Sequence, residues 1–202
     1  AAATTESAYF HGANRGKQSL CVDMGKPRGQ ALIRDLVGHS DVLIENFKVG
    51  SLEKYGLDYA SLHELNSRLI YCSVTGFGQD GPYAPRPGYD FIFQGMGGLM
   101  SITGLPGQGP VRVGIPVADL TAGVFAAMGI LIALLEREES GEGQWVHTSL
   151  LQALIAMTDF QAARWTVAGE VAGQAGNNHP TSMNRQKMAI FYCDTISNAK
   201  NK

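Results

Sequence analysis

Short apolar runs and helical patterns alternate along the first part of the chain. Apolar residues recur at three- and four-residue spacing after Pro27, which predicts a helix that ends at Gly38, and a second helical pattern covers Tyr59–Leu65. Asp41–Glu45 has the apolar composition of a strand that is buried on both faces. Strands and helices that alternate with short connections predict an α/β fold with a Rossmann-like parallel sheet flanked by helices. The three strands expected here are Ser19–Asp23, Asp41–Glu45 and Leu69–Val74.

The rest of the chain is mainly helical in pattern. A long apolar helix is expected from Asp119 to about Glu139, and its uncharged stretch Ala122–Leu135 is shorter than the roughly 20 residues that span a bilayer. We interpret it as a buried helix and expect no association with membranes. The other expected elements are helix Tyr89–Met100, strand Gln144–Ser149 and helix Leu150–Ala168, with Gly- and Pro-rich loops at Gly76–Pro87 and Gly104–Pro116.

In a parallel sheet, ligands bind beyond the carboxyl ends of the strands. These ends are expected at Val22–Gly25, Asn46–Lys48 and Thr75–Gly78. The segment Gly76–Gly81 matches the G-x-G-x-x-G pattern of dinucleotide-binding proteins, but that fingerprint needs a helix to begin at the loop, and Pro82 follows instead. The glycines therefore favour close approach of a strand-end loop to a ligand over an NAD site.

Charge and composition narrow the function classes. The chain of 202 residues carries 16 Lys and Arg against 18 Asp and Glu, a formal net charge of −2 at pH 7. The charges do not cluster, which excludes the basic surface of a nucleic-acid-binding protein. Charged residues make up 17% of the chain, and 25 residues are glycine. This composition indicates much buried surface and a large interface.

The cysteines and histidines indicate a reducing compartment and no metal site. Cys21, Cys72 and Cys193 lie far apart and form no C-x-x-C pair, which disfavours a disulfide scaffold. Cys21 and Cys72 fall in apolar strand-like runs, where a thiol acts as a small hydrophobe. No secretory signal opens the chain, so we expect a cytoplasmic protein, or a mitochondrial or peroxisomal one in a eukaryote. The five histidines lack the spacing of metal ligands.

Asp119 is the only charge between Arg112 and Glu136. At the start of a helix an aspartate commonly caps free backbone N–H groups, and this structural role accounts for the residue by itself. The same N–H groups and the positive end of the helix dipole can instead keep a carboxylate ionised in an apolar pocket. Such a carboxylate is a nucleophile toward an activated acyl group. Both roles stay open on the pattern alone.

Five short motifs follow one another along the chain. They are Asn14–Leu20, Glu45–Gly50, Gly88–Asp90 with Gly98–Gly104, Ala118–Gly123 and Ser140–Gln144. In this order they closely resemble the class III CoA-transferases, the CaiB–BaiF family. The resemblance covers roughly Ala8 to Met183 and implies that residues 1–183 are part of the family's Rossmann-like large domain. Residues 184–202 do not resemble the family's continuation, and we expect them to be a divergent tail.

The resemblance implies that Asp119 is the nucleophile of CoA transfer. In that family the matching aspartate attacks an acyl-CoA thioester to give a mixed anhydride, and the thiolate then forms an aspartyl-CoA thioester that a carboxylic acid acceptor opens. CoA and acyl-CoA are substrates, and no tightly bound cofactor is expected. Tyr71–Gly76 and Pro110–Gly114 look most like transferases that act on dicarboxylates such as succinate and glutarate. The family's CoA contacts carry over to Val22, Met24, Gly25, Asn46, Phe47, Lys48, Lys54, Thr75, Gly76 and Phe77.

Two alternatives remain beside the transferase. The 2-methylacyl-CoA racemases, a sibling branch, abstract a proton with a histidine that precedes the aspartate of the Gly-x-Asp motif. This chain has Tyr89 there, and a tyrosine is a poor base at neutral pH. The other alternative is an inactive, truncated chain that binds CoA, because the family carries further segments on both sides of the matched region. The family folds as two interlocked ring-like subunits, so we expect an interlocked homodimer in the full-length member.

Overall fold

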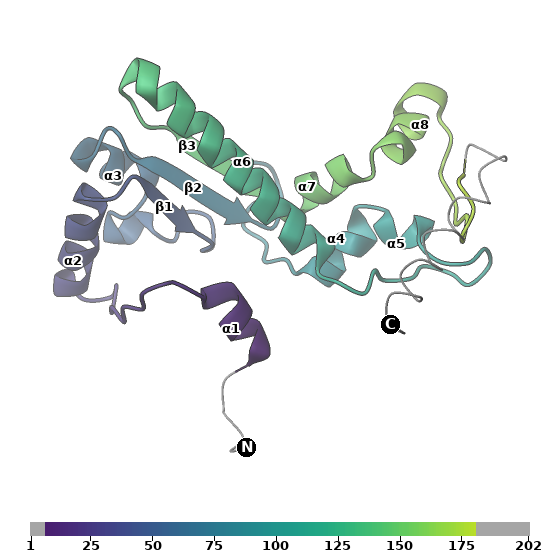
Figure 1. Ribbon diagram of the computed structural model, residues 1–202, viewed down its shortest axis with the longest axis horizontal. Helices are drawn as coiled ribbons and strands as arrows, with labels where there is room; N and C mark the ends of the chain where they lie inside the picture. Colours follow the sequence, from purple (N-terminus) through teal and green to yellow (C-terminus); the bar gives the residue numbers. More distant parts are fainter. Residues whose placement is uncertain (1–6, 181–202) are drawn as a thin grey trace, which may run out of the picture.

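The computed structural model describes residues 7–180. These residues form an elongated body, with a small sheet at one end, short helices at the other and one long helix along the middle (Figure 1). The predicted parallel α/β sheet is confirmed, with the strand order β1–β2–β3. The strands are β1 (Val42–Glu45), β2 (Ile70–Thr75) and β3 (Trp145–Ser149). The helices are α1 (Ala8–Asn14), α2 (Pro27–Gly38), the 3-10 turn η1 (Glu53–Tyr55), α3 (Tyr59–Leu65), α4 (Asp90–Met96), α5 (Leu99–Ile102), α6 (Val117–Ser140), α7 (Leu150–Met157) and α8 (Phe160–Ala168).

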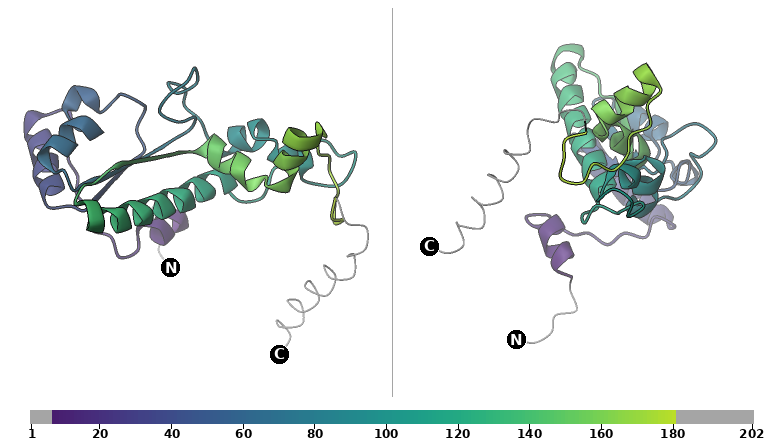
Figure 2. Two further views of the ribbon diagram at one scale, coloured as in Figure 1. Left: turned by 90° about the horizontal axis from the view of Figure 1, so that it is seen from above. Right: turned by 90° about the vertical axis from the view of Figure 1, so that its right-hand side faces the viewer.

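Helices cover both faces of the sheet. On one face, Tyr71 of β2 packs with Val37 of α2 and Leu62 of α3 in a buried core. α6 runs along the opposite face (Figure 2, left). There Gly129 lies so close to Val146 of β3 that an added side chain would collide with it. Because the three strands are parallel, all of them end at one edge of the sheet, and this edge faces the short helices.

A second buried cluster joins this edge to the short helices. It contains Phe93 of α4, Ala118 and Ala122 of α6, and Leu154 of α7. Because alanines occupy the first turns of α6, α4 and α7 can pack closely against it. The cluster therefore holds the N-terminal end of α6 against the carboxyl edge of the sheet.

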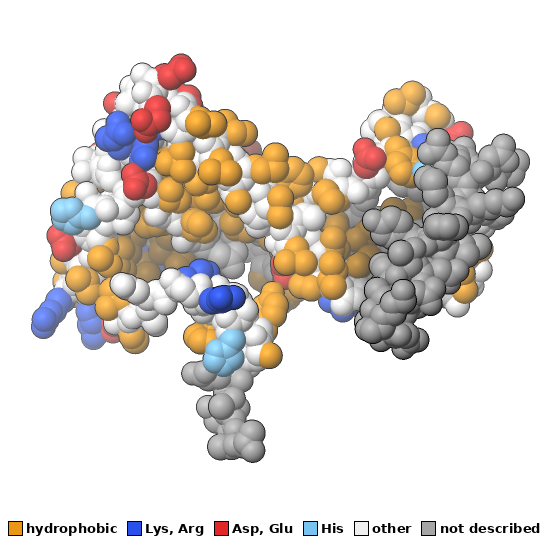
Figure 3. All heavy atoms as spheres, viewed as in Figure 1, with side chains coloured by type: hydrophobic (Ala, Val, Ile, Leu, Met, Phe, Trp, Pro, Cys, Tyr) orange, Lys and Arg blue, Asp and Glu red, His pale blue; other side chains and the backbone are white. Residues whose placement is uncertain are grey.

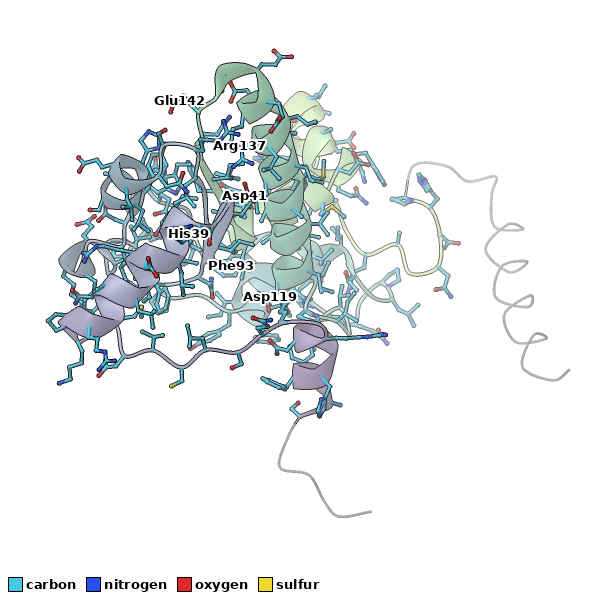
Figure 4. The ribbon with its side chains drawn as sticks, turned by 60° about the vertical axis from the view of Figure 1, so that its left-hand side comes forward. His39, Asp41, Phe93, Asp119, Arg137 and Glu142 are labelled. Atoms are coloured by element: carbon cyan, nitrogen blue, oxygen red, sulfur yellow. The ribbon has the colours of Figure 1, made fainter. Side chains whose placement is uncertain are left out.

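An ion pair holds the opposite end of α6. The Nη2 atom of Arg137 lies 2.9 Å from Oδ1 of Asp41, and Nη1 donates to the Arg68 carbonyl at 2.9 Å. Figure 4 shows Arg137 toward the opposite end of α6 from Asp119. Both ends of the helix are thus tied to the rest of the fold.

The prediction of a strand at Ser19–Asp23 is wrong. The segment is irregular, Leu20 is 61% exposed and Cys21 is exposed. Within residues 7–180 no strand lies beside this run, so it gains no ladder hydrogen bonds to stabilise an extended form. It lies instead against the start of α2, where Gly29 leaves room for the Asp23 backbone. The prediction of a buried thiol is therefore wrong for Cys21 and confirmed for Cys72.

Two predicted helices are broken. The pattern at Tyr89–Met100 divides into α4 and α5 at Gly97 and Gly98, because Gly98 has a φ of 82°. The pattern at Leu150–Ala168 divides into α7 and α8 at Asp159, which has a φ of 47°. Periodicity continues through both breaks and so does not report them. The divergent tail predicted at residues 184–202, which contains Cys193, lies outside the described residues.

Burial differs from expectation on two elements. Ile44 of β1 is 62% exposed, so this strand is not buried on both faces. The apolar stretch of α6 is buried on one side only. Ala122, Ala126 and Ala133 are buried, whereas Figure 3 shows a broad hydrophobic area across the middle of the molecule, over this helix. By length and composition, α6 is the one helix among residues 7–180 that could cross a membrane, and the absence of membrane association stays a prediction. The exposed large side chains of α6 are Leu120, Val124, Phe125, Met128, Leu131, Ile132 and Leu135.

Candidate active site

The first turn of α6 is capped from another helix. Val117 is its first residue, and Pro116 before it supplies no side-chain cap. Asp119 is the third residue of the helix, so of the two roles that the pattern left open, the N-cap is excluded. The N–H of Ala118 donates instead to Oδ1 of Asp90 at 2.8 Å, across a separation of 28 residues in sequence. Asp90, the first residue of α4, thus has the role that the sequence suggested for Asp119: its carboxylate accepts a free N–H at the positive end of the α6 dipole.

Asp90 is the centre of a polar network. Only 7% of the residue is exposed, and its Oδ2 accepts from Nε2 of Gln94 at 2.7 Å and from Nη2 of Arg112 at 3.4 Å. Gln94 is fully buried, donates to the Ile115 carbonyl at 3.1 Å and accepts from the Val113 N–H at 2.8 Å. The network therefore connects α4, the loop before α6 and the first turn of α6.

Asp119 lies in an unfavourable position for a charge. Burial and the neighbouring Asp90 carboxylate raise the pKa of Asp119 above its usual value. This is the opposite of what the helix dipole alone predicts. The difference arises first because Asp119 is partly buried, and second because Asp90, which accepts the Ala118 N–H, is a like-charged neighbour. A carboxylate that is disfavoured in its ionised form is a more basic nucleophile than a well-solvated one.

Two adjoining cavities meet at the carboxyl edge of the sheet. Asp119, Asp90 and Arg112 line the larger one, of about 880 Å³, which we call the reaction cavity. Lys48 and Arg86 line the smaller one, of about 300 Å³, which we call the basic cavity. The two share the wall formed by Asn46, Gly76, Gly88 and Tyr89.

The shared wall depends on two glycines. At both Gly76 and Gly88, the nearest atom to an added Cβ is in the Phe93 ring, too close to tolerate. The strand-end loop and the segment before α4 therefore approach each other over this ring. Figure 4 shows Phe93 and Asp119 at the same end of α6. The core beneath the wall thus also positions the carboxylate.

Six predicted site residues lie around these cavities. Asp119 lines the reaction cavity, Asn46 and Gly76 line both, and Phe47, Lys48 and Thr75 line the basic cavity. Asn46 also donates from Nδ2 to the Val74 carbonyl, which ties the end of β1 to β2. These residues come from segments that are far apart in sequence, so the structure brings them together.

The other predicted site residues lie outside the lining of both cavities, and a role for them in binding CoA stays a prediction. Val22, Met24 and Gly25 precede α2, and Met24 packs against the core between α2 and α3. The Nζ of Lys54 lies 4.7 Å from the ring centre of Tyr55. The Phe77 ring packs against Phe93 and Tyr83, with ring centres 5.0 and 5.3 Å apart.

Sequence reasoning missed Asp90, Arg86 and Arg112 as site residues. Arg112 shares the signal that identified Asp119, because it borders the same uncharged segment. Asp90 shares it too, because no charge lies between Asp90 and Arg112, and it ends the Gly88–Asp90 motif. Arg86 lies in a Pro-rich segment and carries no such signal. Among residues 7–180 no group of three or more His, Cys, Asp or Glu side chains could hold a metal ion.

Comparisons with known proteins agree on one family. The sequence model of CoA-transferase family III matches residues 1–194. The chain is 49% identical over 174 residues to the succinate–glutarate CoA-transferase of Agrobacterium fabrum, covering 86% of this chain and 44% of that protein. It is 41% identical over 166 residues to the succinyl-CoA–D-citramalate CoA-transferase of Chloroflexus aurantiacus, covering 82% of this chain and 41% of that protein.

A solved structure gives the same result. The crystal structure of a CAIB/BAIF family protein from Brucella suis superposes with a TM-score of 0.84 at 45% identity, covering 88% of this chain and 47% of that one. The chain thus spans less than half the length of these three proteins.

Proposed function

The chain belongs to CoA-transferase family III, and from this premise we propose that it carries the nucleophile of a CoA-transferase, Asp119. One observation supports this role above all: Asp119 lines a large cavity that adjoins a second, basic cavity. A reacting carboxylate and a site for the phosphates of CoA are therefore neighbours at one edge of the sheet.

The first half-reaction moves CoA onto the protein. The Asp119 carboxylate attacks the thioester carbonyl of the donor, an acyl C–O bond forms, the C–S bond breaks, and CoA leaves as a thiolate. The thiolate then attacks the Asp119 carbonyl of the mixed anhydride. This step releases the donor acid as a carboxylate and leaves Asp119 as a thioester of CoA.

The second half-reaction is the reverse sequence with a new acid. The acceptor carboxylate attacks the aspartyl-CoA carbonyl and expels the thiolate, which gives a second mixed anhydride. The thiolate then attacks the acyl carbonyl, forms the new acyl-CoA and frees the Asp119 carboxylate. The thiolate must stay bound throughout while water is excluded, because water would hydrolyse the anhydride.

The basic cavity is the proposed site for part of the CoA molecule. Lys48 and Arg86 supply positive charge for phosphate groups, and Phe47 offers an apolar surface for an adenine or a pantetheine arm. Asn46 and Gly76, in the shared wall, lie where the thioester would pass from one cavity to the other.

The substrate class and the assembly follow from the relatives as proposals. Two of them are named for succinate, glutarate or citramalate, so we propose dicarboxylic acyl groups as substrates here. The exposed apolar face of α6 supports the proposed interlocked homodimer, because an apolar surface of this extent marks an interface. A reducing compartment is proposed for the same protein.

The proposed function is tested by mixing the protein with succinyl-CoA and isotopically labelled glutarate. Label that appears in glutaryl-CoA supports CoA transfer. A parallel incubation of 2-methylacyl-CoA in D₂O tests the racemase alternative, since racemisation exchanges the α-proton. Deuterium exchange without label transfer would contradict the proposal, as would the absence of both in a folded protein that binds CoA.

A further inference from the structure

We propose that Arg112 binds the far carboxylate of a dicarboxylic acyl group and thereby selects dicarboxylic over monocarboxylic acids. The inference rests on the proposed function, because it assigns a residue that recognises the substrate at the same site. It concerns specificity and not the chemical steps, which Asp119 carries out.

The charges around the reaction cavity leave one residue for this role. Among the described residues that line it, Asp90 and Asp119 are acidic and Arg112 alone is cationic. An acid that carries a second carboxylate would meet repulsion from both aspartates. A cation in the same cavity is therefore required for such a substrate to bind, and Arg112 is the residue available.

The contact with Asp90 uses only one nitrogen atom of the Arg112 guanidinium. Its contact with Asp90 is a single one, with 3.4 Å between Nη2 and Oδ2, and its side chain is 42% exposed. A charge-assisted hydrogen bond is normally shorter than 3 Å, and an arginine that holds a carboxylate commonly uses two parallel N–H groups. The contact with Asp90 therefore leaves the other N–H groups of the guanidinium available to a ligand in the cavity.

Asp90 does not depend on Arg112 for its hydrogen bonds. Its Oδ1 accepts from the Ala118 N–H at 2.8 Å, and its Oδ2 accepts from Nε2 of Gln94 at 2.7 Å. A substrate carboxylate can thus draw the guanidinium away without leaving a buried carboxylate unpaired. Asp90 holds Arg112 near the cavity while no substrate is bound.

The backbone around Arg112 is fixed on both sides. The N–H of Val111 donates to the Met100 carbonyl at 3.0 Å, and the N–H of Val113 donates to Oε1 of the fully buried Gln94 at 2.8 Å. These two bonds hold the base of the side chain in place although the segment lacks regular secondary structure. Such support is typical of residues that recognise a substrate by geometry.

The test is an internal competition between glutarate and pentanoate, which have the same chain length and differ in one terminal carboxylate. Both acids compete for the same aspartyl-CoA intermediate, so the ratio of glutaryl-CoA to pentanoyl-CoA does not depend on the donor or on the folded fraction. We expect Arg112→Gln to lower this ratio about 10- to 100-fold, the range for loss of a charge-assisted pair. Arg112→Lys should lower it less.

Lys48→Gln is the matched control, because it removes a positive charge from the basic cavity. It should slow the formation of both products and leave their ratio unchanged. An unchanged ratio in Arg112→Gln, with both products reduced equally or not at all, would overturn the assignment and indicate a role in binding CoA or in packing. If the parent forms neither product, the proposed function itself has failed, and the assignment fails with it.

Discussion

The reaction cavity and the basic cavity share a wall but differ in charge. The reaction cavity holds two carboxylates and one arginine, whereas the described lining of the basic cavity holds Lys48 and Arg86 and no acid. The pKa of Asp119 is raised on one side of the wall, where burial and Asp90 disfavour its charge. The other side favours bound anions. The fold thus separates a cavity in which the charge of a carboxylate is disfavoured from a cavity lined by two cations.

The largest effect is expected from Asp119→Asn, which removes the proposed nucleophile and keeps the shape of the side chain. We expect kcat for CoA transfer to fall at least about 1,000-fold, because the other carboxylate of the cavity, Asp90, is held in hydrogen bonds to Ala118 and Gln94. Thermal unfolding should show no loss of stability, since the variant removes a charge that the fold disfavours. A variant that keeps a tenth of the parent's kcat would remove Asp119 from the mechanism.

The next effect, on the free energy of unfolding, is expected from Asp90→Ala. The substitution leaves the Ala118 N–H without its acceptor and removes one of the two acceptors of the buried Gln94 Nε2. We expect the free energy of unfolding to fall by about 2–3 kcal/mol, measured by denaturant titration. Asp35→Ala on α2 is the control, because Asp35 is exposed and should change stability by less than about 0.5 kcal/mol. Equal losses in the two variants would contradict the role of the network.

The basic cavity is probed by Lys48→Gln with a single acyl donor. Its effect should be on binding, with KM for acyl-CoA raised roughly 3- to 10-fold and kcat nearly unchanged, because the proposed contact of Lys48 is with a part of CoA that does not react. Steady-state kinetics at two salt concentrations measures this, and the difference between variant and parent should shrink as salt rises. A fall in kcat with KM unchanged would place Lys48 in the chemistry instead.

The smallest effect is expected in the pH dependence of stability. Because the pKa of Asp119 is raised in the folded state, the folded state binds a proton that the unfolded state releases as pH rises. The stability from this residue is present below the pKa of the unfolded chain and is lost as pH rises through that of the folded chain. Asp119→Asn should therefore gain stability relative to the parent as pH rises from strongly acidic values. A relative loss would show that the folded pKa is lowered.

The local pattern of the sequence predicted those helices and strands that depend on residues close together in the chain. The spans of α2, α3 and α6 follow from spacing and from Pro and Gly signals, and β1, β2 and β3 follow from short apolar runs. The failure at Ser19–Asp23 shows the limit of this information, because a strand also needs a partner beside it. Exposure of the apolar α6 shows a second limit, since apolar pattern predicts a contact and does not say which part of a protein supplies it.

For the candidate site, the sequence indicated Asp119 as the proposed nucleophile but did not indicate how the residues around it are arranged. Asp119 stands alone in an apolar segment, which makes it visible in the sequence. Asp90 acts on the first turn of α6 from 28 residues away, and it meets Arg112 across 22 residues. No spacing rule reaches so far, so its identity as the cap of α6 required the fold. The raised pKa of Asp119, which burial and then the neighbouring Asp90 carboxylate cause, required the fold as well.

Direct capture of the covalent intermediate tests the central claim. The protein is incubated with succinyl-CoA and treated with hydroxylamine, which converts an activated carboxyl group to a hydroxamate, and the modified peptide is mapped by mass spectrometry. The account predicts modification at Asp119 that depends on succinyl-CoA and is absent in Asp119→Asn. CoA transfer without modification at Asp119, or modification of Asp90 in its place, would contradict it.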